Sequence, residues 1–267
     1  MQHRPLDKTP EEIPVVGMGT WAIEGSKSVE ALRLGLNLGM RFIDTAEMYG
    51  SGHSEELVAE ALKGQKEKVF VASKVSPQHF AYENVLRSCQ ASLRRLQMKQ
   101  MDLYQLHWPN PRIPISETMK AMEKLVNDGL IRHIGVSNFS VRQMKEAQTS
   151  LSKYEVVSNQ VEYSLIDRTI ESDILPFCQE EKVTVIAYSP LGQGKIPTGQ
   201  GKEYEILDSI ARKLEKSREQ IALAWVLQHD GVVTIPKASE NEHVKENAEV
   251  GELKLNHEDM QTLNGIF

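Results

Sequence analysis

The chain has few cysteines and no long apolar run. Its two cysteines, Cys89 and Cys178, stand in helix-like positions between apolar neighbours, which favours buried thiols over a disulfide or a nucleophile. No stretch reaches the roughly 18 consecutive apolar residues of a membrane helix, and the amino terminus has no apolar segment typical of a signal peptide. We therefore expect no membrane span and a cytoplasmic location.

An excess of basic residues is also absent. Lys and Arg total 31 against 37 Asp and Glu, and the net charge of −6 argues against nucleic acid as a partner. Neither a Gly-x-Gly-x-x-Gly nor a Walker A run occurs, so we expect no Rossmann or P-loop nucleotide site. A hydrophobic content of 40% over 267 residues is that of a globular protein with a large core.

Strand-like and helix-like segments alternate along most of the chain. The apolar runs lie mostly about 24 to 33 residues apart, the spacing of one strand, one helix and two loops. They begin near Val15, Arg41, Val69, Asp102, Arg132, Val156, Thr184 and Val232. Eight such units predict a closed (β/α)8 barrel, with a doubly wound open sheet as the alternative. Residues 1–14 contain three prolines and indicate a turn-rich arm or a small hairpin.

Several signals mark the ends of the helical segments. Gly39, Gly64 and Gly129 follow apolar stripes of helical spacing as stops. Three capping boxes are expected at the helix starts, formed by Ser140 with Gln143, Ser217 with Gln220, and Ser239 with Glu242. Residues 191–202 carry no regular pattern and suggest a functional lid, before an extra helical stretch over 203–216. No linker interrupts the chain, so residues 1–267 are interpreted as one barrel domain.

Four ionisable residues stand at or just after the carboxyl ends of three early apolar runs. Asp44, Tyr49, Lys74 and His107 would therefore meet at the carboxyl ends of the strands, where barrels place their sites. An ammonium at Lys74 would lower the pKa of Tyr49, and Asp44 would keep that ammonium charged. His107 could bond to a carbonyl oxygen. The group predicts proton transfer at a carbonyl or alcohol oxygen, although each residue alone could equally cap a turn, lie on the surface or pack in the core.

Polar groups also follow the later strands. Ser137, Asn138 and Gln160 could hydrogen-bond a ligand that carries a carboxamide. Tyr188 offers an aromatic face beside Ser189. Near the last strand, Lys237 precedes residues typical of a helix start, and a helix amino terminus beside a lysine suits a phosphate.

Eight stretches, in this order along the chain, resemble signature segments of the aldo-keto reductases. They are residues 17–21 (Gly-Met-Gly-Thr-Trp), 44–49 (Asp-Thr-Ala-Glu-Met-Tyr), 73–74 (Ser-Lys), 106–108 (Leu-His-Trp), 135–139 (Gly-Val-Ser-Asn-Phe), 159–163 (Asn-Gln-Val-Glu-Tyr), 188–192 (Tyr-Ser-Pro-Leu-Gly) and 235–237 (Ile-Pro-Lys). The resemblance implies a (β/α)8 barrel closed at its bottom by an N-terminal hairpin. It also implies an extended nicotinamide cofactor, no metal and a monomer.

The resemblance further implies a role for each matching residue. Tyr49 would be the general acid that protonates the carbonyl oxygen of an aldehyde, a ketone or a keto-sugar during hydride transfer. Lys74 and Asp44 would tune it, and His107 would orient the carbonyl. The implied cofactor contacts are Gly19, Thr20, Ser137, Asn138, Gln160, Tyr188, Ser189, Leu191, Gly192, Lys237, Ser239, His243 and Asn247. Trp21 and Trp108 would wall the substrate pocket, and residues 191–202 would fold over the cofactor.

Two departures from the family pattern bear on specificity. Ala238 and His243 stand where many NADP-preferring members have Ser and Arg, so Lys237 alone would meet a 2'-phosphate; NADP is expected and NAD is possible. The chain ends at Phe267 without the long C-terminal loop of many mammalian members, which predicts an open pocket. Two other functions stay open: lyase chemistry through a Schiff base on Lys74, and cofactor sensing with little turnover.

Overall fold

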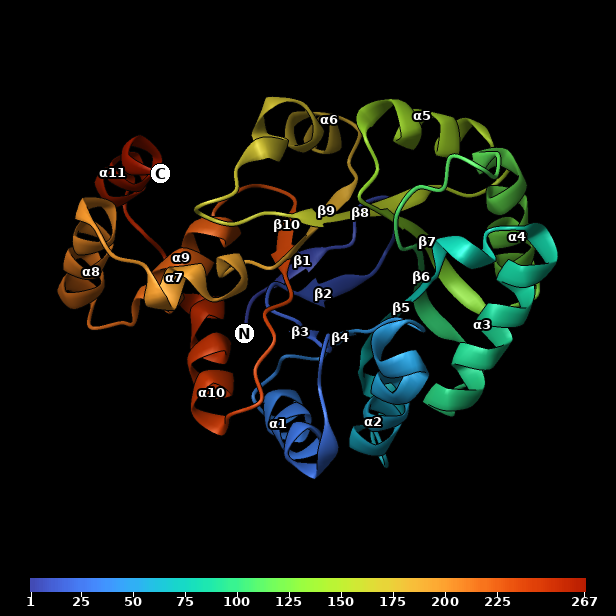
Figure 1. The fold of residues 1–267 in the computed structure, drawn as a ribbon, viewed down its shortest axis with the longest axis horizontal. Coiled ribbons are helices and arrows are strands. Elements are labelled where there is room, and N and C mark those ends of the chain that lie inside the picture. The colour runs from blue at the N-terminus through green and yellow to red at the C-terminus, as the bar shows by residue number, and fades with distance from the viewer.

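Eight parallel strands form the centre of the computed structural model, which describes residues 1–267 (Figure 1). They are β3 (Met18–Gly19), β4 (Phe42–Asp44), β5 (Phe70–Val75), β6 (Met101–Leu106), β7 (Ile131–Ser137), β8 (Val156–Glu162), β9 (Thr184–Tyr188) and β10 (Val232–Thr234), paired in sequence order. The first and last are joined by a parallel bridge between Val16 and Thr234, where the Thr234 amide donates to the Val15 carbonyl at 2.9 Å. The sheet therefore closes on itself, and the predicted barrel is confirmed.

Helices surround the strands and follow the predicted alternation (Figure 1). They are α1 (Gly25–Asn37), α2 (His53–Ala61), α3 (Tyr82–Leu96), α4 (Ile115–Asn127), α5 (Val141–Thr149), α6 (Ile174–Glu180), α7 (Lys195–Thr198), α8 (Lys202–Leu214), α9 (Arg218–Leu227), α10 (Asn241–Glu249) and α11 (His257–Ile266). Short 3-10 turns are η1 (Tyr49–Gly52), η2 (Lys66–Lys68), η3 (Pro77–His79), η4 (Thr169–Ser172), η5 (Gly192–Gly194) and η6 (Val250–Glu252). No helix is both long and apolar enough to cross a membrane.

The helix signals were mostly correct. Gly39, with a φ of +94°, ends the turn after α1, where only a residue without a side chain is unstrained. Both capping boxes at Ser140 and Ser217 are present. The box expected at Ser239 is wrong, because α10 begins two residues later and its cap Glu240 makes no side-chain bond. Residues 191–202 are not structureless either, since η5 and α7 lie within them.

An N-terminal hairpin closes one end of the barrel. Its strands β1 (His3–Pro5) and β2 (Glu12–Pro14) pair antiparallel just before β3, which places the hairpin at the amino ends of the barrel strands. Leu6 and Ile13 are fully buried and pack with interior side chains of six barrel strands. This apolar plug confirms the predicted closure and leaves only the opposite, carboxyl end available for a site.

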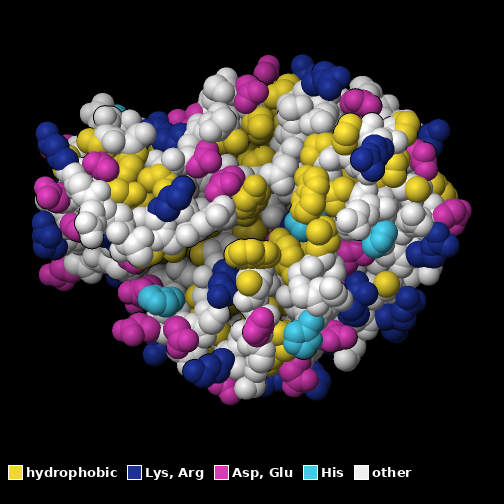
Figure 2. All heavy atoms as spheres, viewed as in Figure 1, with side chains coloured by type: hydrophobic (Ala, Val, Ile, Leu, Met, Phe, Trp, Pro, Cys, Tyr) yellow, Lys and Arg dark blue, Asp and Glu magenta, His cyan; other side chains and the backbone are white.

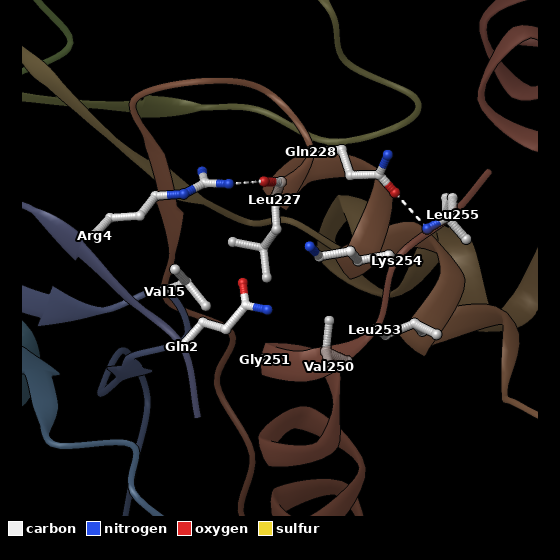
Figure 3. Close-up of a pocket in the computed structure, with 10 residues that line it drawn as sticks. All are labelled: Gln2, Arg4, Val15, Leu227, Gln228, Val250, Gly251, Leu253, Lys254 and Leu255. Carbon is white, nitrogen blue, oxygen red and sulfur yellow. Dashed lines mark hydrogen bonds between the residues drawn. The ribbon is translucent and has the colours of Figure 1, made fainter. Parts of the chain in front are cut away.

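Arg4 holds the hairpin to the end of α9. Its guanidinium donates to the carbonyls of Leu227 and Val232 and, at 2.9 Å, of His229, beside a recess of about 250 Å³ (Figure 3). A cation at a helix carboxyl end satisfies carbonyls that have no partner within the helix. The hairpin is thus attached both by its apolar side chains and by this cation.

The barrel interior changes from apolar to polar along each strand. Side chains two apart on a strand share a face, so Phe42 and Asp44 both point inward from β4, as Ala72 and Lys74 do from β5. Phe42 and Ala72 pack with the apolar side chains of the hairpin. Asp44 and Lys74, nearer the carboxyl ends of the strands, form a polar layer. Both cysteines, in contrast, are buried free thiols among core side chains, as expected.

Candidate active site

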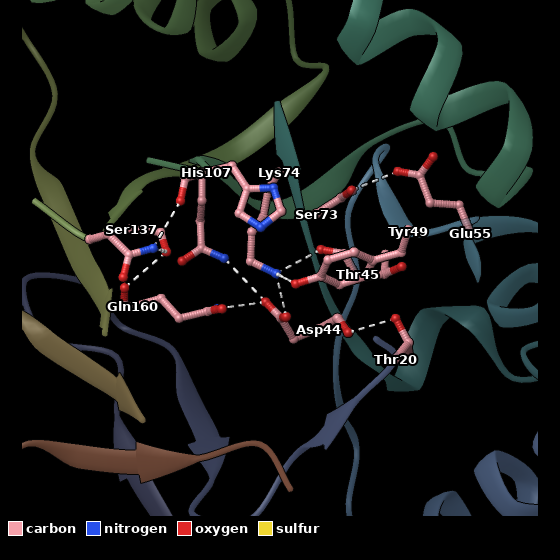
Figure 4. Close-up of polar contacts among 12 residues, drawn as sticks. Thr20, Asp44, Thr45, Tyr49, Glu55, Ser73, Lys74, His107, Ser137 and Gln160 are labelled. Carbon is pink, nitrogen blue, oxygen red and sulfur yellow. Dashed lines mark hydrogen bonds and ion pairs between the residues drawn. The ribbon is translucent and has the colours of Figure 1, made fainter. Parts of the chain in front are cut away.

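Three neighbouring strands deliver the predicted catalytic group. Asp44 ends β4, Lys74 lies near the end of β5, and His107 directly follows β6. Tyr49 begins the turn η1 after β4 and returns over the barrel mouth. The structure therefore brings together all four residues that strand phase predicted (Figure 4).

Lys74 is the centre of this group. Its side chain is fully buried, and its Nζ donates to Asp44 Oδ2 at 2.5 Å, to the Thr45 carbonyl at 3.0 Å and to the Tyr49 hydroxyl at 3.1 Å (Figure 4). Burial lowers the pKa of Lys74, but Asp44 and Tyr49 together more than offset this, and the net pKa lies above the ordinary value. The amine is consequently a charged donor to the phenol.

Tyr49 stays protonated at neutral pH. Burial raises its pKa, the Lys74 ammonium opposes the rise, and the Asp44 carboxylate adds to it. The lowering by Lys74 that the sequence predicted is present, but burial has the larger effect, so the net pKa of Tyr49 lies above its ordinary value. A protonated phenol beside a fixed ammonium can donate a proton, because the ammonium stabilises the phenolate that is left.

Two amides and a threonine fix Asp44. Gln160 Nε2 donates to Asp44 Oδ1 at 2.7 Å, and Gln105 Nε2 donates to the same oxygen at 3.3 Å. Thr20 is fully buried, and its hydroxyl donates to the Asp44 carbonyl at 3.0 Å. Gln105 was not predicted from the sequence, although its place two residues before His107 was a signal. Of the residues expected at a cofactor, Gln160 here holds the Asp44 carboxylate and Thr20 holds the Asp44 backbone.

His107 is neutral in its position at the mouth. Burial, and then the nearby Lys74 ammonium, lower its pKa to about 3. Its Nδ1 is buried without a hydrogen-bond partner, and its ring meets the Tyr49 ring edge to face with centroids 5.5 Å apart. A neutral imidazole can orient a carbonyl oxygen without competing with Tyr49 as the acid.

Turnover is expected to show no histidine step between about pH 5 and pH 8, because His107 is neutral throughout that range. The lowered pKa of His107 also affects the free energy of unfolding. As the pH falls below about 6.5, His107 takes up a proton in the unfolded chain but not in the folded protein, so the folded protein loses stability. Measuring kcat against pH for the wild type and for His107→Gln tests this. A step near pH 6.5 that disappears in the variant would contradict it.

A second polar cluster lies beside the tetrad. Asn138 has a φ of +59°, and its Nδ2 donates to the His107 carbonyl at 3.2 Å. Tyr188 donates its hydroxyl to Asn138 Oδ1 at 3.0 Å, and the Ser137 hydroxyl donates to the Gln160 carbonyl at 2.9 Å. The structure therefore brings the predicted carboxamide contacts together, with Asn138 bonded to the half-buried Tyr188.

The remaining predicted cofactor residues lie toward the rim. Gly19 packs against β10's extension, since a side chain there would meet the Ile235 carbonyl at 2.6 Å. Three of them follow β9: Ser189, Leu191 and the buried Gly192. Four lie before or within α10: Lys237 and His243 are exposed, Ser239 is half-buried, and Asn247 is buried. His243 Nδ1 lies 3.2 Å from Glu246. These groups form an outer set, separate in the chain from the tetrad.

Large apolar side chains surround the mouth. Trp21 is 69% exposed and Trp108 39%, and Trp108 packs on the His107 ring with centroids 4.5 Å apart. Met48, 40% exposed, immediately precedes Tyr49 and was not predicted. Hydrophobic side chains gather at the centre of the face shown in Figure 2. Exposed tryptophans next to buried polar groups are typical of a small-molecule site.

The barrel, with buried Asp44, Lys74 and His107 and the half-buried Tyr49 at its carboxyl end, defines an oxidoreductase-type site. The model of the Aldo/keto reductase family matches residues 15–267, and the chain belongs to this family. It is 43% identical over 261 residues to methylglyoxal reductase YeaE of Escherichia coli (strain K12), covering 96% of this chain and 91% of that protein. It is 36% identical over 259 residues to glyoxal reductase of Bacillus subtilis (strain 168), covering 96% and 89%.

Solved structures of aldo-keto reductases have the same fold as this chain. The thermostable aldo-keto reductase Tm1743, crystallised with the inhibitor epalrestat, superposes with a TM-score of 0.93 at 42% identity, covering all of both chains. An aldo-keto reductase from Klebsiella pneumoniae in complex with NADPH superposes with a TM-score of 0.90 at 39% identity, covering 96% of this chain and 92% of that one.

Proposed function

We propose that this protein reduces small aldehydes, and 2-oxoaldehydes above all, to alcohols with NADPH, with Tyr49 as the general acid. The observation that carries the proposal is the Tyr49 hydroxyl 3.1 Å from the buried Lys74 Nζ, where the raised pKa values of both groups favour a neutral phenol and a charged amine. Such a phenol can give its proton to a carbonyl oxygen, and general acid catalysis of this kind contributes about 10² to 10⁴ in rate.

The residues around Tyr49 have separate tasks. His107 orients the carbonyl oxygen toward the phenol as a neutral hydrogen-bonding group. Lys74 stabilises the phenolate once the proton has left, and Asp44 keeps Lys74 charged. The exposed side chains of Trp21 and Trp108 offer an apolar surface to the substrate beside the mouth.

The donor set fits a nicotinamide cofactor. Ser137, Asn138 and Gln160 form one hydrogen-bonded group that reaches the Tyr188 hydroxyl through Asn138, and their amide and hydroxyl groups suit a carboxamide. Lys237 is exposed at the rim ahead of α10 and is suited to a phosphate. When bound, the cofactor supplies a hydride to the carbonyl carbon. The NADPH complex of the Klebsiella pneumoniae protein supports the phosphorylated form for this chain too.

The substrate class rests on the mouth and on the relatives. The exposed side chains of Trp21, Met48 and Trp108 favour a small or apolar carbonyl compound over a charged one. Two relatives are named reductases of methylglyoxal and glyoxal, both of which are small dicarbonyl compounds. Keto-sugars, which are larger and more polar, are proposed as poorer substrates. A Schiff base on Lys74 is disfavoured, because its raised pKa leaves little free amine.

Spectrophotometry of NADPH consumption tests this function. Methylglyoxal, glyoxal, simple ketones and keto-sugars are supplied in turn, with NADPH and then with NADH. We expect the highest kcat/KM for the 2-oxoaldehydes and tighter binding of NADPH than of NADH. A higher kcat/KM for a keto-sugar would refute the substrate class, and cofactor binding without oxidation by any carbonyl would refute the reductase activity.

A further inference from the structure

A second buried carboxylate lies close to the tetrad but takes no direct part in it. Glu55 is in the first turn of α2 and is fully buried. Its Oε1 accepts a hydrogen bond from the Ser73 hydroxyl at 2.6 Å, and its Oε2 accepts one from Arg95 Nε at 2.6 Å (Figure 4 shows the first). A buried charge costs several kcal/mol to desolvate, so short bonds on both oxygens call for an explanation.

The hydrogen bond to Ser73 connects Glu55 with the strand that carries Lys74. Ser73 immediately precedes Lys74 on β5, and successive side chains of a strand point to opposite faces. Lys74 therefore points into the barrel while Ser73 points out toward α2. The Glu55–Ser73 hydrogen bond sets the spacing between the start of α2 and the strand that carries Lys74.

The other contact leads to the turn that carries Tyr49. In η1, Gly50, Ser51 and Gly52 have φ values of +56°, +55° and +95°, and Ser51 in particular is strained there. The side chain of Arg95 packs on this turn, since a Cβ at Gly52 would lie 2.5 Å from Arg95 Nε. A strained turn keeps its geometry only if its surroundings hold it.

We propose that the Glu55–Arg95 ion pair and the Glu55–Ser73 hydrogen bond form a clamp that positions Tyr49 against Lys74. Glu55 is thereby a positioning residue for the reaction proposed above, on which this inference rests. The clamp joins α2 through Glu55, β5 through Ser73 and α3 through Arg95. Loosening it lets the strained turn relax, which moves the Tyr49 hydroxyl away from Lys74.

The other titratable groups that face Glu55 do not share its charge. Burial, with a further contribution from Glu55, raises the pKa of Cys89 to about 12, and burial raises the pKa of Tyr104 well above its ordinary value. Arg95 is the cation on this side. Tyr49 itself faces Lys74 on β5, Asp44 on β4, His107 just after β6 and Tyr188 on β9. Burial raises its pKa most, and the Lys74 ammonium is the charge that lowers it.

Two variants open the clamp in different ways. Ser73→Ala removes only the bond to β5. The double variant Glu55→Met/Arg95→Met replaces the ion pair by apolar side chains of similar length, which is often neutral for stability, whereas removal of one partner would leave a buried charge. Glu56→Gln is the matched control, because Glu56 is the next residue of α2 and its only ion pair, to His53, is exposed.

The readouts are the tyrosinate absorbance of each variant against pH, measured relative to its Tyr49→Phe counterpart, and kcat and KM in both directions. We expect the pKa of Tyr49 to rise, because the more distant Lys74 ammonium lowers it less. Alcohol oxidation, which needs the phenolate, then slows about tenfold at neutral pH, with KM little changed and the control unaltered.

An unchanged Tyr49 pKa and kcat in folded variants would overturn the clamp. If the double variant does not fold, Ser73→Ala decides alone, and a lower melting temperature without a change in pKa would leave Glu55 a merely structural residue and also overturn the proposal. A wild-type protein without turnover would refute the proposed function instead, and the absorbance titration would still decide the clamp.

Discussion

Tyr49→Phe is expected to reduce kcat for aldehyde reduction by about 10³-fold, because it removes the proton donor and almost no volume. The phenol makes one hydrogen bond in the site, to Lys74 at 3.1 Å, and its ring keeps the edge contact with His107 when the hydroxyl is lost. The geometry of the mouth is therefore preserved, and the loss reports on proton transfer alone. Steady-state kinetics at saturating NADPH measure it.

The affinity for NADPH is the control for this variant. Fluorescence titration should give a Kd close to that of the wild type, since none of the proposed cofactor contacts includes the Tyr49 hydroxyl. A variant that binds NADPH normally and keeps a near-normal kcat would exclude Tyr49 as the acid. A variant that loses binding as well would show a wider disturbance, and His107→Gln would then be needed as a second probe of the mouth.

Lys74→Met is expected to abolish measurable turnover and to destabilise the protein by about 3–5 kcal/mol. Lys74 and Asp44 have side chains 0% and 2% exposed and lie 2.5 Å apart, so loss of the ammonium leaves a carboxylate buried without its cation. Gln105 and Gln160 would still donate to Asp44 Oδ1 but carry no charge. Urea denaturation and kinetics on the same preparation measure the two effects.

The double variant Asp44→Asn/Lys74→Met separates stability from catalysis. Removing both charges should recover much of the folding free energy, because no buried charge remains unpaired. Turnover should stay absent, since Tyr49 still lacks the ammonium that stabilises its phenolate. Recovery of turnover together with stability would show that Lys74 has only a structural role.

The tetrad was predictable because it follows a simple rule of strand geometry. Asp44, Lys74 and His107 each come at the carboxyl end of an apolar run, and parallel strands of a barrel end on one face. The hairpin was predicted less specifically, since the three prolines in residues 1–14 indicated only an arm or a hairpin. Its function became visible only when Leu6 and Ile13 were seen inside the barrel.

Other parts of the site could not be predicted from local pattern. Gln105 occupies a strand position where a buried apolar residue would fit the pattern equally well, and only its contact with Asp44 reveals a role. Glu55 has the position of an ordinary acidic residue in a helix first turn. The capping box expected at Ser239 failed because the chain leaves β10 extended for several residues more before α10 begins.

The sequence by itself determined the order and type of the elements, because periodicity, stops and caps act over a few residues. It also determined which side chains reach the carboxyl face, because strand phase is a local property. Only the tertiary structure decided the charge states of the site. The pKa of Tyr49 depends on the balance between burial and the Lys74 ammonium, and that of His107 on burial. Both quantities arise from groups far apart in the chain, which packing alone brings within a few ångströms.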